Sequence, residues 1–200
     1  MVTIGIAGGV ASGKSVIAGK LQELGAVLID GDQLGHEVLR QAEVIAIARE
    51  HWGDQVIDGQ GQIDRAAVAR RVFGSQPEAD AELEFWEACT HPRITRLLEN
   101  RLKQLTEQKD VVVVLDAPVM FKAGWDRLCD HLIFVDCPHP MRLERALKRS
   151  NWDEKQFTER EASQLSLDEK RRRASFVIDN SASVDETYAQ VLEFWSHLSD

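Results

Sequence analysis

The chain has 200 residues, a formal net charge of −9 and a hydrophobic content of 44%. That length suits one domain, or one domain with a small insertion, and the composition is ordinary for a protein with a buried core. The acidic surplus argues against a broad basic face for a nucleic-acid backbone, although it is compatible with a local basic pocket. No apolar run in the sequence approaches the roughly 18 residues that span a bilayer.

The cysteines indicate a reducing compartment. Cys89, Cys129 and Cys137 form an odd set without C-x-x-C spacing, which suggests neither a zinc site nor a disulfide framework. Free thiols of this kind are typical of the cytosol. The first residues lead into a strand without the basic and apolar segments of a secretory leader. We therefore expect a cytoplasmic protein.

The first predicted element is a short β-rich run over residues 2–7, and a glycine-rich segment follows it. Residues 8–15 read Gly-Gly-Val-Ala-Ser-Gly-Lys-Ser and fit the phosphate-binding P-loop pattern G-x-x-x-x-G-K-[ST]. A helix-like stretch over residues 15–24 comes next, so strand, loop and helix stand in the order that a phosphate site requires. A glycine-rich turn that matches by chance is the alternative, and this placement argues against it.

Each part of this loop has a physical role toward a nucleotide. Gly8 and Gly13 allow backbone conformations that are closed to residues with a Cβ, so the loop N–H groups can form a nest for phosphate. The following helix adds the positive end of its dipole. We expect Lys14 to reach the β- and γ-phosphates and the Ser15 hydroxyl to bind Mg²⁺. The residues expected to contact ATP in this segment are Gly9, Ala11, Ser12, Gly13, Lys14, Ser15 and Val16.

Further apolar runs of strand length follow at residues 26–30, 111–116 and 131–136, with a weaker one at 176–179. Continuous hydrophobicity predicts strands that are buried on both faces. Because helix-like stretches alternate with these runs, we predict a parallel sheet with helices on both sides. The predicted fold class is α/β, a three-layer α/β/α P-loop domain with a five-stranded parallel sheet.

The stretch between the second and third predicted strands is too long for one crossover connection. It predicts a helix near residues 33–51, a turn at 58–61, a helix over about 64–73 and a long helical region from 77 to about 106. An insertion of this kind is where a second substrate could be held. We expect one domain with a core of about 1–32, 107–140 and 174–200, a helical substrate-binding insertion of about 33–106 and a lid of about 141–173.

The expected lid is helical in propensity and dense in charge over residues 142–173. A solvated helical face is one interpretation of such a run. In a P-loop protein, a mobile lid whose arginines close on phosphates is the sharper one. Arg145 and Arg149 share a helical face because they lie one turn apart. The basic run at residues 170–173 is more typical of a solvated stretch.

Carboxylates follow two of the predicted strands, at the end of an open α/β sheet where ligands bind. Asp30 is suited to capping the next helix, whereas Asp32 is the better candidate for a general base. Asp116 ends a run of valines, as in a Walker B strand, and would lie near Mg²⁺ or the acceptor; strand termination by a polar residue is the alternative. His91 in the helical insertion is a lone histidine, which is more often structural than ligand-binding.

This ordered series of motifs resembles the dephospho-CoA kinase family of P-loop kinases over nearly the whole chain. Many families share the P-loop, but the order of the other segments is specific. The segments that resemble that family's are Ala-Val-Leu-Ile-Asp-Gly-Asp at 26–32, Gly-Gln-Ile-Asp-Arg at 61–65 with Val72 and Phe73, His-Pro-Arg-Ile at 91–94, Leu-Asp-Ala-Pro-Val-Met-Phe at 115–121, and Arg160, Gln164 and Lys170 followed by Ile-Asp-Asn at 178–180.

The resemblance implies transfer of the ATP γ-phosphoryl group to the ribose 3′-hydroxyl of dephospho-CoA, the last step of CoA biosynthesis, with Mg²⁺. By motif, Asp32 takes the role of base or orienting carboxylate, Arg149 reaches phosphate from the lid and Asn180 lies beside the adenine. The residues implied to lie near dephospho-CoA are Arg65, His91 and Pro118. The implied partners are these small molecules, without nucleic acid or membrane, for a monomer or small homo-oligomer.

The sequence departs from the family pattern at four positions. Lys122 and Ser175 stand where the family often has Glu and Asp, and Ala11 and Val16 replace the commoner Gly and Thr of the loop. None of these changes removes a phosphate, Mg²⁺ or proton-transfer group, although Lys122 reverses a charge on the acceptor side.

Three other functions are open to a chain with this loop. One is another small-molecule P-loop kinase, acting on a nucleoside or its monophosphate, and the D-x-D and H-P segments argue against it. Another is a nucleotide switch that binds a protein partner, but the sequence lacks the N-K-x-D motif that reads guanine. The third is nucleotide binding without catalysis, against which the presence of Lys14, Ser15 and Asp32 argues.

Overall fold

The computed structural model describes residues 1–74, 77–108, 110–150 and 152–198, except for the side chains of residues 149 and 150. The chain divides into two compact units. Residues 1–31 and 104–200 make up the first unit, and residues 32–103 make up the second.

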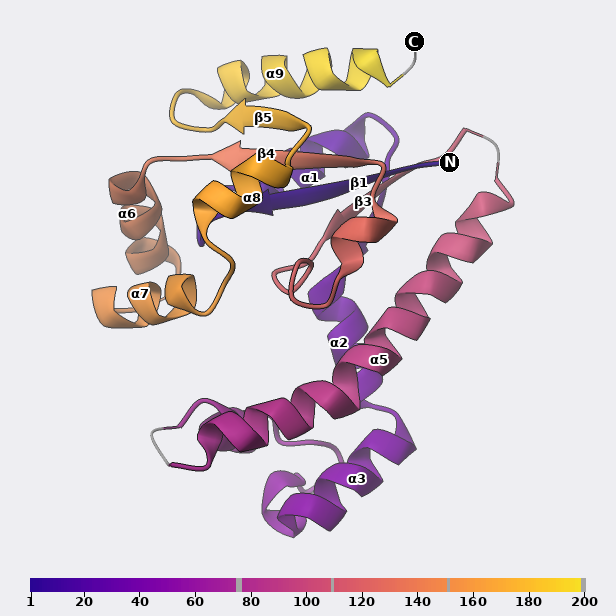
Figure 1. Ribbon diagram of the computed structural model, residues 1–200, viewed down its shortest axis with the longest axis vertical. Coiled ribbons are helices and arrows are strands. Elements are labelled where there is room, and N and C mark those ends of the chain that lie inside the picture. Colours follow the sequence, from indigo (N-terminus) through magenta and orange to yellow (C-terminus); the bar gives the residue numbers. More distant parts are fainter. Residues whose placement is uncertain (75–76, 109, 151, 199–200) are drawn as a thin grey trace. The chain divides into compact units, whose positions relative to one another are not determined.

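A five-stranded, all-parallel sheet forms the centre of the first unit, with the strand order β2-β3-β1-β4-β5 (Figure 1). The strands are β1 (Val2–Gly8), β2 (Val27–Asp30), β3 (Val112–Asp116), β4 (His131–Asp136) and β5 (Phe176–Asp179). Each predicted apolar run forms a strand, including the weak fifth one, so the predicted five-stranded parallel α/β fold is confirmed.

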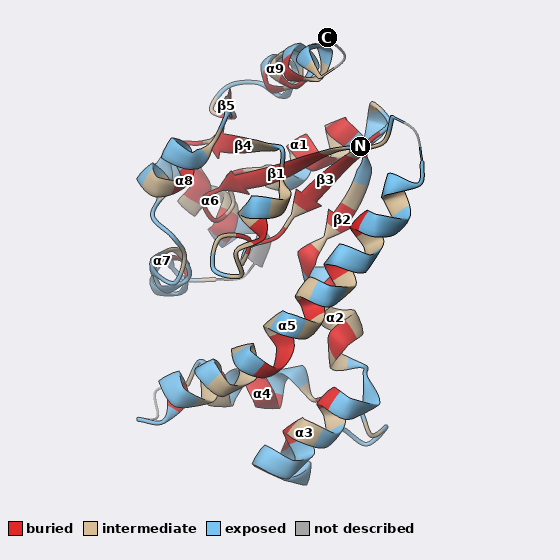
Figure 2. Cartoon of the chain, turned by 45° about the vertical axis from the view of Figure 1, so that its right-hand side comes forward, coloured by how far each residue is buried: buried red, intermediate tan, exposed pale blue. Residues whose placement is uncertain are grey.

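The interiors of β1, β3 and β4 are buried, as the red strands of Figure 2 show. On one face, Ile4 and Ile6 belong to a buried cluster with Leu21 of α1 (Lys14–Glu23) and Phe194 of α9 (Val184–His197). On the other face, a Cβ at Gly5 would lie 2.6 Å from Leu132 Cδ2. Figure 1 shows α8 (Leu167–Arg173) in front of the strands and α1 behind them.

The second unit is helical, and its first helical stretch is broken where the sequence predicted continuity. In place of one helix near residues 33–51, the structure has α2 (Gly31–Leu39) and α3 (Ala42–Trp52). Buried Val38 and Val44 are six residues apart, which does not fit the three-to-four residue spacing of a single helical face. The chain therefore reorients before α3, whose first helical residue follows Gln41 in an extended conformation.

The predicted turn at residues 58–61 is present and leads into a capped helix. The Asp58 carboxylate accepts hydrogen bonds from the backbone N–H groups of Gln60 and Gln62, at 2.9 Å each. α4 (Arg65–Val72) follows, and the Asp64 side chain accepts from two backbone N–H groups of its first turn. Aspartate at this position satisfies donors that have no partner within the helix.

The long helix α5 (Ala79–Thr106) contains Pro92 in its interior. Proline lacks the N–H that a helix interior uses, and its ring crowds the carbonyl four residues earlier. Figure 1 shows that α5 changes direction along its length, and Pro92 accounts for a bend of this kind.

Two further helices, α6 (His139–Ser150) and α7 (Glu154–Ala162), precede α8 in the segment that the sequence marked as dense in charge. Asp153 and Gln156 form a capping box that begins α7. Ala146 of α6 and Phe157 of α7 form a buried cluster with Val10 of the glycine-rich loop. This apolar contact ties the two helices to the loop.

Candidate active site

The glycine-rich loop connects β1 to α1 through two left-handed backbone conformations. Gly13, the residue before α1, has φ 98°, and Ala11 has φ 57°. Glycine adopts this region without the steric cost that a Cβ brings, whereas Ala11 is strained by about 1 kcal/mol or more. A Cβ at Gly13 would also lie 2.1 Å from Asn180 Nδ2. Both the left-handed backbone conformation and this close approach therefore favour glycine at this position.

Asn180 anchors the loop from the end of β5. Its Nδ2 donates to the Ser12 carbonyl oxygen at 2.7 Å, and its Oδ1 accepts from Thr187 Oγ1 at 3.0 Å. The side chain is 6% exposed, so this pair of hydrogen bonds sets the orientation of a buried amide. The sequence placed Asn180 beside the adenine; in the structure it contacts the backbone of the phosphate loop.

Arg142 is a second anchor, and it is buried at 2% exposure. Its Nε donates to the Cys137 carbonyl oxygen at 2.9 Å, its Nη1 donates to the Val10 carbonyl oxygen at 3.4 Å, and its guanidinium pairs with Glu161. The side chain therefore links α6, α7 and the loop. Losing one partner of such a pair would leave an uncompensated buried charge.

Of the two arginines expected on the lid face, one lies at the loop. Arg145 Nη2 donates to the Asn180 carbonyl oxygen at 3.3 Å, and its Nη1 lies 3.8 Å from the place of a Cβ on Gly13. Arg149 lies in α6, but its side chain is outside the described residues.

Carboxylates meet at the carboxyl end of the sheet. Asp30 of β2 and Asp116 of β3 are register partners, and Asp116 is also paired with Ile6 of β1. Ser15 lies in the first turn of α1, and Asp32 is the second residue of α2. A Cβ at Gly31 would lie 2.6 Å from Ala117 Cβ, so the first residue of α2 packs tightly against the residue that follows β3.

Lys170 contradicts the expectation that residues 170–173 form a solvated stretch. It is 4% exposed, and its Nζ donates to the Gly8 carbonyl oxygen at 3.2 Å and to Gln164 Oε1 at 2.7 Å. Burial, followed by the charge of Lys14, lowers the pKa of Lys170 to about 8. The sequence pattern of four consecutive basic residues does not show which of them is buried. Lys170 is buried because α8 packs on β1.

The three arginines after Lys170 are more exposed, and each forms an ion pair. Arg171 pairs with Asp136, Arg172 with Glu169, and Arg173 with Asp126 and Glu169. The pairs with Asp136 and Asp126 connect α8 to other segments, whereas the pairs with Glu169 lie within α8. The basic run therefore has a structural role although its arginines are exposed.

A small cavity lies next to the phosphate loop within the first unit. It brings Lys14 and Lys170 together with Pro118, which the family resemblance placed near the acceptor. The residues that line it are Ile6, Ala7, Gly8, Lys14, Ala117, Pro118, Phe121, Gln164 and Lys170.

The other predicted acceptor residues lie in the second unit. Arg65 begins α4 and lines a pocket of about 370 Å³ together with His36, Arg40 and Gln62. His91 lies in α5, where its carbonyl oxygen accepts a hydrogen bond from Thr95 Oγ1 at 2.9 Å.

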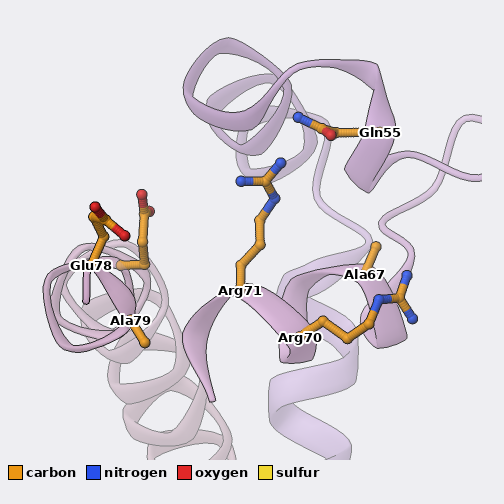
Figure 3. A pocket seen from close by; sticks show the side chains of 7 residues that line it. Gln55, Ala67, Arg70, Arg71, Glu78 and Ala79 are labelled. Atoms are coloured by element: carbon orange, nitrogen blue, oxygen red, sulfur yellow. The ribbon is translucent and has the colours of Figure 1, made fainter. Parts of the chain in front are cut away.

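A larger pocket of about 560 Å³ occupies the second unit without including a predicted site residue. Figure 3 shows the Arg71 side chain extending between Gln55 and Glu78. The other residues that line this pocket are Ala67, Arg70, Ala79 and Glu82. Hydrogen bonds from Trp52 and His51 lower the pKa of the Glu82 carboxyl.

The cysteines are free thiols, as the sequence predicted. Burial raises the pKa of Cys129 to about 12 and also raises the pKa values of Cys89 and Cys137. Such thiols stay protonated and unreactive near neutral pH.

Within the described ranges, no three His, Cys, Asp or Glu side chains gather to hold a metal ion. None of the helices in these ranges has the length and apolar character needed to cross a membrane.

The phosphate loop at the end of a parallel strand, with α6 and α7 packed against it, defines a P-loop nucleotide-binding protein. The family model for dephospho-CoA kinase matches residues 2–186. The chain therefore belongs to the dephospho-CoA kinase family, whose members transfer phosphate from ATP to dephospho-CoA.

Individual relatives agree with this assignment. The chain is 34% identical to the dephospho-CoA kinase of Syntrophotalea carbinolica over 199 residues, covering 99% of this chain and 92% of that one. It is 38% identical to the dephospho-CoA kinase of Deinococcus radiodurans over 188 residues, covering 94% and 88%.

Solved structures show the same fold. A crystal structure of a Thermus thermophilus protein matches with a TM-score of 0.82 and 31% identity, covering 98% of this chain and 96% of that one. A dephospho-CoA kinase structure from Campylobacter jejuni matches with a TM-score of 0.67 and 20% identity, with the same coverage.

Proposed function

We propose that this protein transfers the γ-phosphoryl group of ATP to the ribose 3′-hydroxyl of dephospho-CoA, giving CoA and ADP. The observation that carries the proposal is the phosphate loop: Gly13 and Ala11 are left-handed, and Asn180 anchors the Ser12 carbonyl. This loop stands within the family match over residues 2–186.

The loop residues are proposed to hold the ATP phosphates. Backbone N–H groups around left-handed residues form anion-binding nests, and α1 directs its positive end to the same place. The buried Ser12 hydroxyl has no hydrogen-bond partner among the described residues, which fits a loop built around a further polar group. The proposed ATP-binding residues are Gly9, Ala11, Ser12, Gly13, Lys14, Ser15, Val16 and Asn180.

A magnesium ion that arrives with the nucleotide fits the donors at the end of the sheet. Mg²⁺ keeps several waters and takes one or two protein oxygens besides phosphate oxygens, so a larger cluster of side chains is not required. Ser15 at the start of α1 and Asp116 at the end of β3 are the proposed ligands. The ion would neutralise charge on the phosphates.

The proposed transfer is an in-line displacement at the γ-phosphorus. The bond to the β–γ bridging oxygen breaks and leaves its electron pair on ADP, while the acceptor oxygen bonds to phosphorus. The hydroxyl proton passes to the Asp32 carboxylate, the proposed base. Lys14 stabilises the phosphates, and Arg149 is proposed to add positive charge from α6.

The acceptor is proposed to contact Arg65, His91 and Pro118 besides Asp32. Two local observations support this: Arg65 lines a pocket with other basic side chains, and Pro118 lines the cavity that contains Lys14. We assign the helical insertion of about 33–106 to dephospho-CoA and the helices of about 141–173 to a lid over ATP. The free thiols support a cytoplasmic enzyme, and the acidic surplus supports small-molecule partners rather than nucleic acid. We propose a monomer or small homo-oligomer.

A coupled assay of ADP release with ATP and Mg²⁺ tests the proposal. Dephospho-CoA is compared with AMP, CMP, adenosine and no acceptor, and the nucleotide product is identified by mass. We expect strong stimulation by dephospho-CoA alone, with CoA as product. Stimulation by a nucleotide or nucleoside instead would establish a different small-molecule kinase. Equal release without an acceptor would indicate a nucleotide hydrolase or switch, and Asp32 would lose its assigned role.

A further inference from the structure

Lys170 is a buried cation that the proposed mechanism does not use. Its two hydrogen-bond acceptors, the Gly8 carbonyl oxygen and Gln164 Oε1, are both uncharged. A buried ammonium group is costly unless an opposite charge compensates it. The burial of this side chain at 4% exposure therefore needs a reason beyond packing.

The charges around Lys170 are mostly of the same sign. Lys14 and Arg142 repel its ammonium group, and Glu161 is the carboxylate that acts in the opposite direction. Glu161 itself already pairs with Arg142. Among the charged groups that shift the pKa of Lys170, the positive ones are thus in excess, and an anion beside Lys170 would offset their effect.

The position of this charge excess identifies the anion. The Lys170 ammonium donates to the carbonyl of Gly8, and that of Lys14 donates to the carbonyl of Gly9 at 3.3 Å. The two side chains line the same cavity, together with Pro118. Asn180 and Arg145 approach Gly13, at the other end of the loop. Lys170 therefore lies at the same end of the loop as the Lys14 ammonium group. In this class of site, Lys14 is the residue that reaches the γ-phosphate.

We propose that Lys170 is a second catalytic lysine, whose ammonium group contacts the γ-phosphoryl group and shares with Lys14 the neutralisation of its charge during transfer. This inference rests on the proposed function only where it assumes dephospho-CoA as the acceptor. The contact between Lys170 and the γ-phosphate does not depend on which acceptor is used. Gln164 is the positioning residue, because its Oε1 holds Nζ at 2.7 Å. Lys170 keeps its protons throughout, and only the phosphoryl group and the acceptor proton move.

A purely structural role for Lys170 predicts a different behaviour. In that case the hydrogen bond to Gly8 would only fasten α8 to β1, and its loss would lower stability without a specific effect on the γ-phosphate. A contact between Lys170 and the γ-phosphate predicts a specific loss of affinity when the lysine is replaced. Affinity should fall for ligands that carry a γ-phosphate and stay unchanged for ADP.

Lys170→Met tests the proposal, since methionine keeps most of the apolar stem and removes the charge. Arg172→Met on the same helix is the matched control, because Arg172 is exposed and pairs with Glu169 within α8. The wild type and both variants are compared in thermal unfolding, in kcat with dephospho-CoA, and in equilibrium affinity for ADP and for a non-hydrolysable ATP analogue with Mg²⁺.

We expect K170M to lose about 10²- to 10³-fold in kcat, the range seen when one preorganised donor is removed from a transition state. The affinity of K170M for the analogue should fall at least about tenfold, while its affinity for ADP changes less than about threefold. In R172M, both affinities should match those of the wild type. Equal losses for ADP and analogue, or a kcat within about threefold of wild type, would overturn the proposal. Should K170M fail to fold, Lys170→Gln takes its place in the same comparison.

The two binding measurements contain no acceptor, which separates this proposal from the proposed function. A wild type that does not phosphorylate dephospho-CoA would overturn the acceptor assignment. The ratio of analogue to ADP affinity in K170M would still decide whether Lys170 contacts the γ-phosphate.

Discussion

The depressed pKa of Lys170 predicts that the folding stability of this protein rises in mildly alkaline solution. Burial and the charge of Lys14 lower the pKa from its usual 10.5 to about 8. Between these values the unfolded chain holds a proton that the folded protein has released, so unfolding takes up a proton and stability increases with pH. Below about pH 8 the lysine is charged in both states, and the cost of burying the charge is fully present.

The size of this effect follows from the two pKa values. Going from about pH 7 to about pH 9.5, Lys170 should contribute about 2 kcal/mol to the free energy of unfolding. For a chain of this length, that corresponds to a rise of about 4–8 °C in the unfolding midpoint. The charged groups that set the shift are Lys14, Arg142 and Glu161, so their own titration must be separated from that of Lys170.

Comparison with Lys170→Met provides that separation. The free energy of unfolding is measured in urea for both proteins at about pH 7 and about pH 9.5, and the change in the variant is subtracted from the change in the wild type. The difference should be positive and close to about 2 kcal/mol. A difference below about 0.5 kcal/mol, or one of opposite sign, would show that the folded protein does not disfavour the charged lysine.

Four other changes test the site. Lys14→Ala should lower turnover by about 10³-fold or more with the fold intact by circular dichroism, and near-normal turnover would remove the phosphate-site assignment. Asp32→Asn should lower kcat by about 10²- to 10⁴-fold, whereas a loss below about threefold would limit Asp32 to positioning a ligand. Gly13→Ala should abolish measurable ATP binding in calorimetry, because its Cβ would meet Asn180 at 2.1 Å; normal affinity would refute the stated need for glycine. Thr187→Val should cost about 1–2 kcal/mol in urea unfolding and weaken ATP binding by releasing the Asn180 amide, and an unchanged affinity would show that this hydrogen bond does not orient the loop.

The fold was accessible from the sequence because its evidence is local. Each strand of a doubly covered parallel sheet must be apolar along its whole length, and such runs are visible without knowledge of their neighbours. β4 and β5 have the predicted bounds, and β1, β2 and β3 differ by one residue at one end. The glycine-rich loop is equally local, since its backbone conformations and its lysine are encoded within eight consecutive residues.

The break between α2 and α3 shows where local evidence ended. Both segments favour helix, so propensity alone predicted one continuous helix. The spacing of Val38 and Val44 held the signal for a break, but its meaning depends on which side chains are buried, and that is a property of the packed unit.

The anchors of the loop were decided by tertiary structure alone. Arg142 belongs to the segment predicted as a lid and Lys170 to the run predicted as solvated. Packing of α6 and α8 buries both side chains at the phosphate loop. Asn180 reaches the loop from 168 positions away in the chain. The sequence by itself determined the strands, the phosphate loop and its lysine, because these depend on neighbouring residues. Only the folded chain determined which distant cations surround that loop, because burial and hydrogen bonding depend on the elements that pack together.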